Sequence, residues 1–224
     1  MGPELSSCRL YGIVDLGYVS ATDARRVAEK MIDGGVDILQ LRAKDHAIAS
    51  IIPIVRDLLQ LTSAADRPLV VNDYAEVARE LAVEGVHVGQ DDLPIARVRE
   101  VRARSIIVGK STHSIKQARA AQAEGADYIG FGPIFPTPTK PDYEPIGLKQ
   151  IRQVHAELTL PIFCIGGIKI ENLQSVIDAG AKRVVIVSGL LQARDIVEYA
   201  RSAKDMLASK SEIRNPKSET SSND

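Results

Sequence analysis

Eight short aliphatic runs recur along the chain, and longer segments with helical periodicity separate them. The runs are rich in Val and Ile, and polar residues follow at their carboxyl ends, which is typical of buried parallel strands. The sequence therefore predicts alternating strands and helices. The expected strands cover residues 10–14, 37–41, 68–71, 86–88, 106–108, 128–131, 162–165 and 184–187.

Glycines mark the ends of the helical segments. In residues 22–34 the apolar side chains share one helical face, and Gly34-Gly35 ends the segment. A glycine also comes shortly before several expected strands, at Gly85, Gly125 and Gly180. This recurrence indicates a repeated strand–helix unit.

Eight such units in about 200 residues predict a single-domain α/β protein with the (β/α)8 TIM-barrel fold. A doubly wound open sheet is the rival, but its nucleotide-binding form carries a Gly-rich loop after the first strand, which residues 15–18 do not supply. We expect the barrel domain to cover residues 1–208. Residues 209–224 are polar, rich in Ser and without periodicity, so we expect a disordered C-terminal tail.

The charge balance excludes several classes of partner. The chain has 28 Lys and Arg against 29 Asp and Glu, a net charge of −1, which argues against binding nucleic acid or an anionic membrane by bulk charge. Aromatic residues make up only 4%, and Trp is absent, so stacking platforms for bases are not expected. A homo-oligomer is compatible with the sequence.

The cysteine content and the apolar runs favour a cytoplasmic protein. Cys8 and Cys164 are too few and too far apart for a disulfide framework or a zinc site. No apolar stretch approaches the roughly 18 residues of a membrane span. Residues 1–7 do not have the pattern of a signal peptide.

In a barrel of this kind, chemistry collects at the carboxyl ends of the strands. Gln40 and Arg42 follow the second run with the alternation that points them the same way, and Lys44 comes next. Two cations so close together suit a ligand with several negative oxygens, although an ordinary salt-bridged strand end is the alternative.

Acidic residues follow the next two runs. Asp73 comes after the third run, beside Asn72, and Asp91-Asp92 come after the fourth. Carboxylates on neighbouring strand ends can hold Mg²⁺ together with substrate phosphate and water. The alternative is that Asp91 or Asp92 caps the helix that begins near Pro94.

The later loops suggest further phosphate contacts. Ser111 can donate to a phosphate, whereas Ser114 is a natural helix cap. The loop at 132–141 contains several prolines and favours an ordered lid or clamp. Gly166-Gly167 and Ser188-Gly189 suit a neutral phosphate site, although glycines there can also serve packing alone. Two anion sites at one barrel mouth suggest the joining of two phosphorylated substrates.

Taken in order, these motifs resemble the thiamine-phosphate synthase family over residues 10–191. The specific ones are Gln-Leu-Arg-Ala-Lys at 40–44, Gly-Gln-Asp-Asp at 89–92 and Pro-Thr-Pro-Thr-Lys at 136–140. The resemblance implies an enzyme that joins 4-amino-2-methyl-5-(diphosphooxymethyl)pyrimidine to 4-methyl-5-(2-phosphooxyethyl)thiazole, giving thiamine phosphate and diphosphate.

The resemblance also implies roles for individual residues. The pyrimidine diphosphate would be bound by Gln40, Leu41, Arg42, Ala43, Lys44, Asn72, Ser111 and Lys140, and the thiazole phosphate by Thr137, Pro138, Thr139, Gly167, Val187 and Ser188. Asp73 and Asp92 would hold Mg²⁺. The expected catalytic residues are Arg42, Lys44, Ser111 and Lys140, which would assist the departure of diphosphate from the pyrimidine methylene.

Tyr74 and Glu76 depart from the family pattern, which often has Arg and Asp at these positions. Two other functions stay open: a thiazole tautomerase-like paralogue, and a non-catalytic barrel that binds phosphorylated metabolites. The paralogue would not need Asn72, Asp73, Asp92 and Lys140 together, and a turnover assay with both substrates and Mg²⁺ would distinguish the non-catalytic barrel.

For the histidines, the sequence predicts positions but no assigned role. We expect His46 and His155 to be exposed in helical segments and His87 to be packed within a strand. His113 is expected near the barrel mouth.

Overall fold

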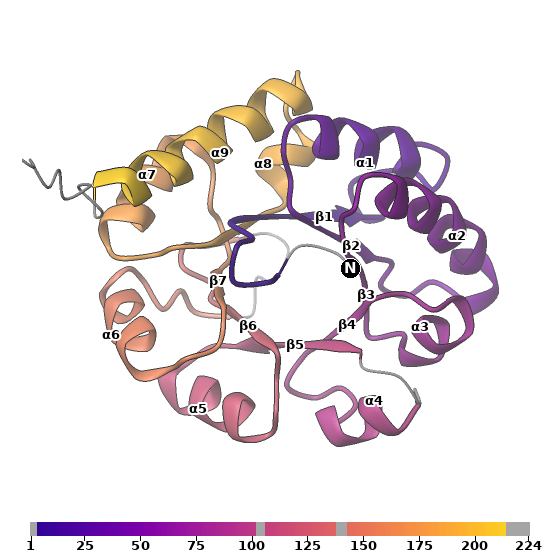
Figure 1. Ribbon diagram of the computed structural model, residues 1–224, viewed down its shortest axis with the longest axis horizontal. Coiled ribbons are helices and arrows are strands. Elements are labelled where there is room, and N and C mark those ends of the chain that lie inside the picture. The colour runs from indigo at the N-terminus through magenta and orange to yellow at the C-terminus, as the bar shows by residue number, and fades with distance from the viewer. Residues whose placement is uncertain (1–3, 102–105, 138–142, 214–224) are drawn as a thin grey trace, which may run out of the picture.

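The computed structural model describes residues 4–101, 106–137 and 143–213. Parallel strands close into a barrel in sequence order, and β8 pairs with β1 (Figure 1). The predicted (β/α)8 fold is confirmed. The strands are β1 Leu10–Asp15, β2 Ile38–Arg42, β3 Leu69–Asn72, β4 Gly85–Val88, β5 Ile107–Thr112, β6 Tyr128–Phe131, β7 Ile162–Cys164 and β8 Val184–Ile186.

The helices form a ring around the barrel (Figure 1). The C-terminal helix packs against α1 and α7, so the last helix lies beside the first one. The helices are α1 Ala24–Asp33, α2 Ile48–Ala64, α3 Ala75–Leu81, α4 Ile95–Val101, α5 Ile115–Ala123, α6 Lys149–Glu157, α7 Ile170–Asp178, α8 Ser188–Leu191 and α9 Ile196–Ile213.

Two hydrophobic layers hold the fold together. The larger one lies between the barrel and the helices, and it includes the face predicted for α1. The smaller one fills the barrel interior, where alternate residues of each strand point inward. A Cβ on Gly109 would lie 2.0 Å from the Tyr128 ring, so this position on β5 must be glycine to leave space for the ring. The inner layer consists of Cys8, Tyr11, Ile13, Ile38, Val70, Tyr128, Phe163 and Val185.

Helix α9 changes the boundary expected for the C-terminal tail. The helix runs to Ile213, so residues 209–213 are helical, and the expectation of disorder is wrong for them. Residues 214–224 lie outside the described part of the chain.

Cys8 and Cys164 are free and buried, so the prediction that they form no disulfide is confirmed. Burial raises the pKa of the Cys164 thiol to about 12, which keeps this thiol protonated at neutral pH. In the described residues, no helix is both long enough and apolar enough to cross a membrane.

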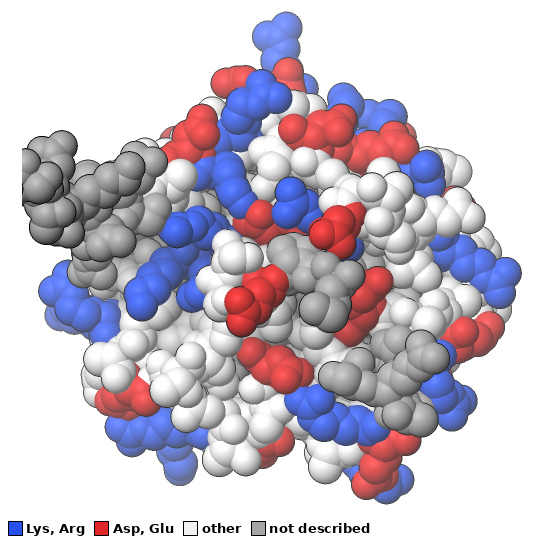
Figure 2. Space-filling view, viewed as in Figure 1, with Lys and Arg blue, Asp and Glu red and all other residues white. Residues whose placement is uncertain are grey.

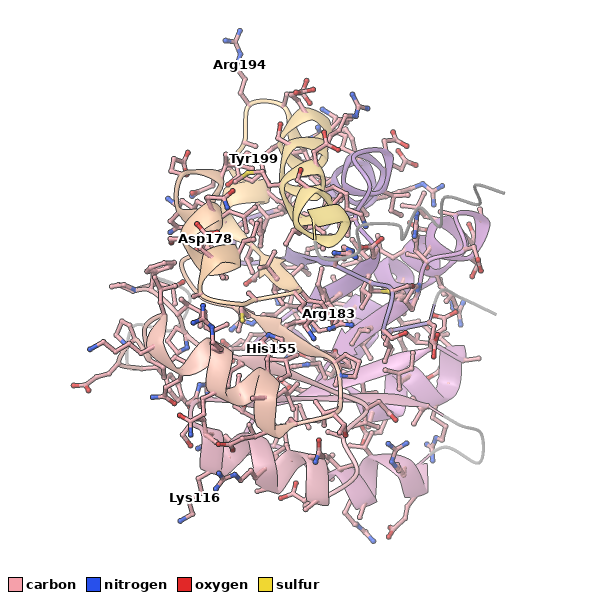
Figure 3. All side chains as sticks on the ribbon, turned by 60° about the vertical axis from the view of Figure 1, so that its left-hand side comes forward. Lys116, His155, Asp178, Arg183, Arg194 and Tyr199 are labelled. Carbon is pink, nitrogen blue, oxygen red and sulfur yellow. The ribbon has the colours of Figure 1, made fainter. Side chains whose placement is uncertain are left out.

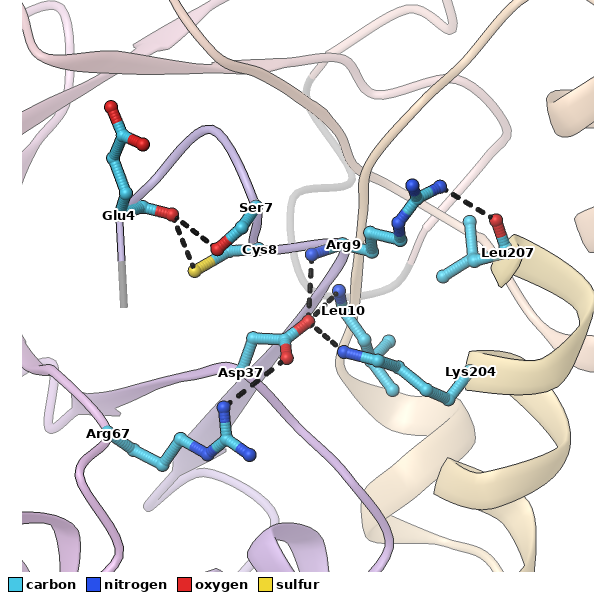
Figure 4. A network of polar contacts seen from close by, with 9 residues as sticks. All are labelled: Glu4, Ser7, Cys8, Arg9, Leu10, Asp37, Arg67, Lys204 and Leu207. Atoms are coloured by element: carbon cyan, nitrogen blue, oxygen red, sulfur yellow. Dashed lines mark hydrogen bonds and ion pairs between the residues drawn. The ribbon is translucent and has the colours of Figure 1, made fainter. Parts of the chain in front are cut away.

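A buried carboxylate joins both ends of the chain at the amino end of the barrel (Figure 4). Asp37 accepts hydrogen bonds from the backbone N–H groups of Arg9 at 2.8 Å and Leu10 at 3.0 Å. It also pairs with Lys204 of α9 and, at 3.6 Å, with Arg67. One side chain therefore ties the start of β1 to the residue before β2 and to α9.

We predict that Asp37→Asn lowers the free energy of unfolding by about 2–4 kcal/mol, because the substitution removes the charge that two cations share. Chemical denaturation measures this loss. Asp205→Asn, at an exposed carboxylate of α9, is the control and should change stability by less than about 0.5 kcal/mol. Equal effects of the two substitutions would contradict a structural role for Asp37.

Candidate active site

A pocket opens at the carboxyl ends of the strands, where the barrel interior meets the loops. We call it the mouth pocket. Residues far apart in the sequence converge there because parallel strands end at the same face of the barrel. Its lining consists of Tyr11, Ile13, Asp15, Gln40, Arg42, Asn72, His87, Ser111, Thr112, His113, Tyr128, Gly130, Gly132, Pro133, Thr137, Ile165, Gly166, Gly167, Ile168, Val185, Val187 and Ser188.

Many residues predicted from the sequence meet in this pocket. Gln40 and Arg42 both line it, as their alternation along β2 predicts. The lining includes residues expected to bind the pyrimidine diphosphate and residues expected to bind the thiazole phosphate. The two sets of residues therefore share one cavity. The predicted residues in the lining are Gln40, Arg42, Asn72, Ser111, Thr137, Gly167, Val187 and Ser188.

Other predicted residues lie elsewhere. The side chains of Leu41 and Ala43 are buried in the outer layer between the barrel and the helices, and neither residue belongs to the pocket lining. Lys44 is exposed and does not belong to the lining. Pro138, Thr139 and Lys140 lie outside the described residues.

The two predicted metal ligands follow neighbouring strands but do not line the pocket. Asp73 comes directly after β3, has a positive φ of 67°, and accepts a hydrogen bond from the Asn72 amide. Asp92 lies in the loop after β4, where its Oδ2 accepts the Gly89 N–H at 2.6 Å. No group of three or more His, Cys, Asp or Glu suited to a metal occurs in the described residues. Two carboxylates nevertheless fit Mg²⁺, which takes its other ligands from water and substrate phosphate.

An ion pair holds Arg42 in the pocket. Its guanidinium contacts Asp15 at 2.6 Å, and the Asp15 side chain is only 3% exposed. Asp15 also accepts the Gly17 N–H at 2.9 Å. The carboxylate therefore orients Arg42, whose own side chain stays 18% exposed towards the pocket. Sequence reasoning assigned no role to Asp15, although its place at the end of the first strand was a signal.

A chain of hydrogen bonds crosses the pocket floor. The Gln40 amide donates to the Tyr11 hydroxyl at 2.7 Å, and this hydroxyl lies 2.9 Å from that of Tyr128. The Tyr128 hydroxyl lies 3.1 Å from Nδ1 of His87, and Nε2 of His87 lies 2.9 Å from Oγ of Ser111. Two predicted substrate contacts, Gln40 and Ser111, are thus linked through the barrel interior.

One arrangement of the protons in this chain starts from the Gln40 amide. Since the Gln40 amide nitrogen only donates, Tyr11 can donate onward to Tyr128, and Tyr128 to Nδ1 of His87. Nε2 of His87 then carries the proton and donates to Ser111, whose own hydroxyl proton remains for a ligand. Burial raises the pKa of both tyrosines, so the two hydroxyls stay protonated.

The histidines differ in part from expectation. His87 is buried within β4, as predicted, but it also lines the pocket. His113 lies at the pocket, and its Nδ1 donates to the Gly132 carbonyl at 2.6 Å, so the ring fixes the start of the loop after β6. His46 is exposed but lies in a turn before α2. His155 is partly buried in α6, so its predicted exposure is wrong.

Two glycines fix the loops after β6 and β7 against each other. Gly166 and Gly167 have φ angles of 99° and 64°. A Cβ on Gly166 would lie 2.4 Å from Pro133, and one on Gly167 would lie 2.6 Å from the Pro136 carbonyl oxygen. Close packing is therefore one role of these glycines, which also line the pocket, and this packing places Thr137 there.

Tyr74 connects the loops after β2 and β3. Its hydroxyl lies 2.8 Å from the Ala43 carbonyl and 2.9 Å from that of His46. Glu76 lies in the first turn of α3, where the negative charge of its carboxylate interacts favourably with the helix dipole. Ser114 is the N-cap of α5 and accepts the Gln117 N–H, which confirms the predicted cap.

A closed (β/α)8 barrel with polar side chains gathered at its carboxyl face defines a barrel enzyme. Residues 10–190 match the sequence model of the family described as thiamine monophosphate synthase. The chain therefore belongs to this family.

Similar proteins agree with this assignment. The chain is 42% identical to the thiamine-phosphate synthase of Halalkalibacterium halodurans over 84% of this chain and 90% of that protein. It is 39% identical to the thiamine-phosphate synthase of Chloroflexus aurantiacus over 89% and 93%. The solved structure of thiamine phosphate pyrophosphorylase from Pyrococcus furiosus superposes with a TM-score of 0.83 at 28% identity, over 92% of this chain and 98% of that one.

We predict that Arg42→Ala destabilises the protein by about 3–5 kcal/mol, because it leaves the Asp15 carboxylate buried without its cation. Adding Asp15→Asn to Arg42→Ala should restore much of this loss but not activity. Denaturation curves of the single and double variants measure the coupling energy. Additive effects of the two substitutions would contradict the ion pair.

We also predict that Gly166→Ala is more destabilising than Gly125→Ala. Gly125 also has a positive φ, of 87°, but among the described residues an added Cβ would meet nothing within 4 Å. Gly125→Ala should therefore cost only the backbone strain of about 1–2 kcal/mol and leave activity intact. Gly166→Ala adds the overlap with Pro133, so it should also displace the loop and lower activity. Equal losses of stability and activity would contradict this argument.

Proposed function

We propose that the mouth pocket joins 4-amino-2-methyl-5-(diphosphooxymethyl)pyrimidine to 4-methyl-5-(2-phosphooxyethyl)thiazole, giving thiamine phosphate and diphosphate. The observation that carries this proposal is that the residues predicted to bind the diphosphate and those predicted to bind the monophosphate line one pocket. The residues of the diphosphate set in this lining are Gln40, Arg42, Asn72 and Ser111. Those of the monophosphate set are Thr137, Gly167, Val187 and Ser188. The activity named for the similar proteins supports the same reaction.

The charges of the pocket suit this pair of ligands. Arg42 gives the β2 side a cation, and its ion pair with Asp15 fixes the direction of the guanidinium. A diphosphate needs such charge because its leaving oxygen gains negative charge as the bond to the methylene breaks. The side formed by the loops after β7 and β8 offers glycines and a serine hydroxyl, which suffice for a monophosphate.

The hydrogen-bond chain prepares Ser111 to assist the leaving group. We take His87 as the donor in its 2.9 Å contact with Oγ of Ser111, so that the serine proton is available to a diphosphate oxygen. In this arrangement His87 does not act as a base towards Ser111. The pair is therefore a donor to the substrate and not the nucleophile–base pair of an acyl-transfer enzyme.

The second substrate needs no deprotonation by the protein, because a thiazole ring nitrogen has a free lone pair. The protein must therefore align the thiazole nitrogen with the pyrimidine methylene. It must also exclude water from this electron-poor carbon. The glycine-packed loops after β6 and β7 cover the pocket at Thr137, and Lys140 of the same loop is proposed to contact the diphosphate.

Asp73 and Asp92 are the residues proposed to hold Mg²⁺. When bound there, the ion would neutralise negative charge on the diphosphate. Two hydrogen bonds orient these carboxylates: the Asn72 side-chain amide donates to Asp73, and the backbone N–H of Gly89 donates to Asp92.

A turnover assay with both substrates and Mg²⁺ tests the proposal. Thiamine phosphate and diphosphate should appear in equal amounts, and diphosphate should not appear from the pyrimidine substrate and water. Rearrangement of a thiazole phosphate alone would favour the tautomerase, and binding of both ligands without diphosphate release would favour the non-catalytic barrel.

The same assay tests the metal ligands. Asp73→Asn and Asp92→Asn should each lower kcat/KM by about a hundredfold or more and raise the Mg²⁺ concentration needed for half-maximal rate. Asp91→Asn is the matched control at an exposed neighbouring carboxylate, and it should keep nearly full activity. Normal Mg²⁺ dependence in both single variants would contradict the assignment.

A further inference from the structure

A second cleft lies on the opposite face of the barrel, at the amino ends of the strands. It is bounded by the segment before β1, by α6, by the end of α7 with the turn that follows, and by Leu207 of α9. Its volume is about 740 Å³, within the range of small-molecule sites. We call it the amino-face cleft. It shares no residue with the mouth pocket, so it is not part of the site described above.

Positive charge dominates this cleft. Arg9, Arg152, Lys182 and Arg183 line it, and Asp178 is the one carboxylate of its described lining. Figure 2 shows Lys and Arg side chains gathered on this face between α6 and α7. Four cations against one carboxylate contrast with the balanced charge of the whole chain.

Backbone carbonyls, and not carboxylates, hold three of the guanidinium groups. Arg9 donates to Leu207 at 3.0 Å, Arg183 donates to Ser6 at 2.5 Å, and Arg152 donates to Asp178 at 3.3 Å through the carbonyl of that residue. These bonds orient the side chains without neutralising them. The cations are therefore held in place while their charge remains available to a ligand.

Repulsion between the positive charges of the cleft also lowers the pKa of individual basic groups. Burial, together with Lys182 and Arg183, lowers the pKa of His155 to about 4. Burial and the proximity of Arg9 lower the pKa of Arg183. Nε2 of His155 and Nε of Arg183 are shielded from solvent and have no hydrogen-bond partner among the described residues. Figure 3 shows both residues on the same side of the molecule, below Asp178.

Such an arrangement is costly when it is empty, since like charges and unsatisfied donors both destabilise it. An anion in the cleft offsets the repulsion and accepts hydrogen bonds from the guanidinium groups. Arginine binds phosphate oxygens in a bidentate manner, and three arginines with a lysine suit a ligand with several linked phosphates.

We infer that the amino-face cleft is a second binding site of this protein, for a small molecule that carries two or more linked phosphate groups. Arg9, Arg152, Lys182 and Arg183 are its ligand-binding residues. The site is separate from the proposed reaction at the barrel mouth.

Calorimetric titration with inorganic triphosphate in EDTA tests the site. EDTA removes Mg²⁺, which would otherwise favour triphosphate binding at the mouth pocket. Arg152→Gln/Lys182→Gln replaces two exposed cations of the cleft, so the fold should be retained. This variant should bind triphosphate about tenfold or more weakly than the unmodified protein. Its rate of thiamine phosphate formation should be unchanged.

Lys116→Gln/Arg194→Gln is the matched control. It removes the same charge from two exposed positions that point away from the cleft (Figure 3), and it should leave triphosphate affinity unchanged. An equal loss of affinity in both double variants would overturn the proposal, because binding would then follow overall charge. Binding of citrate as tight as that of triphosphate would overturn the assignment to phosphates.

Proton NMR of the His155 imidazole gives a second, local measurement in the unmodified protein. Saturating triphosphate should raise the pKa of His155 from its low value of about 4, because a nearby anion favours the charged ring. His155→Gln assigns the resonance. An unchanged His155 titration in the presence of bound triphosphate would place the ligand elsewhere and overturn the site.

Discussion

The pairing of β8 with β1 is the constraint on which the rest of this structure depends. Leu10 lies opposite Val184 and Gly12 opposite Ile186, and this register closes the sheet without an edge. Closure brings the carboxyl ends of the first and last strands together, so that Asp15 and Ser188 line the same pocket. It also brings their amino ends together, where Arg9 and Arg183 line the second cleft.

The barrel interior is more polar than the aliphatic sequence suggests. Two tyrosines and a histidine form a hydrogen-bonded chain across it, and each hydroxyl has partners. Burial of such groups is tolerated only when they are satisfied, so the chain also restricts their orientation. Tyr11 and Tyr128, two of the few aromatic residues of this protein, thus connect Gln40 to His87 and Ser111.

The two faces of the barrel use charge differently. At the carboxyl face, the pocket cation Arg42 is paired with Asp15, which fits a site that must orient a reacting group. At the amino face, Asp37 pairs with Arg67 and Lys204 in a structural network. In the part of the chain that the structure describes, the guanidinium groups of the neighbouring Arg9 and Arg183 donate to backbone carbonyls. A net charge of −1 therefore conceals a local concentration of cations at the amino face.

The sequence by itself determined the barrel, because eight aliphatic runs separated by amphipathic segments bury well only as parallel strands under helices. It also determined which strand ends carry polar groups, since alternation along β2 is enough to place Gln40 and Arg42 on one side. Only the tertiary structure decided how those groups are paired. The contacts of Arg42 with Asp15, and of His87 with Tyr128, join residues 27 and 41 positions apart. Local patterns do not encode such contacts, because they depend on the register of the closed sheet. For the same reason, the burial of His155 between neighbouring elements could not be deduced from its helical segment alone.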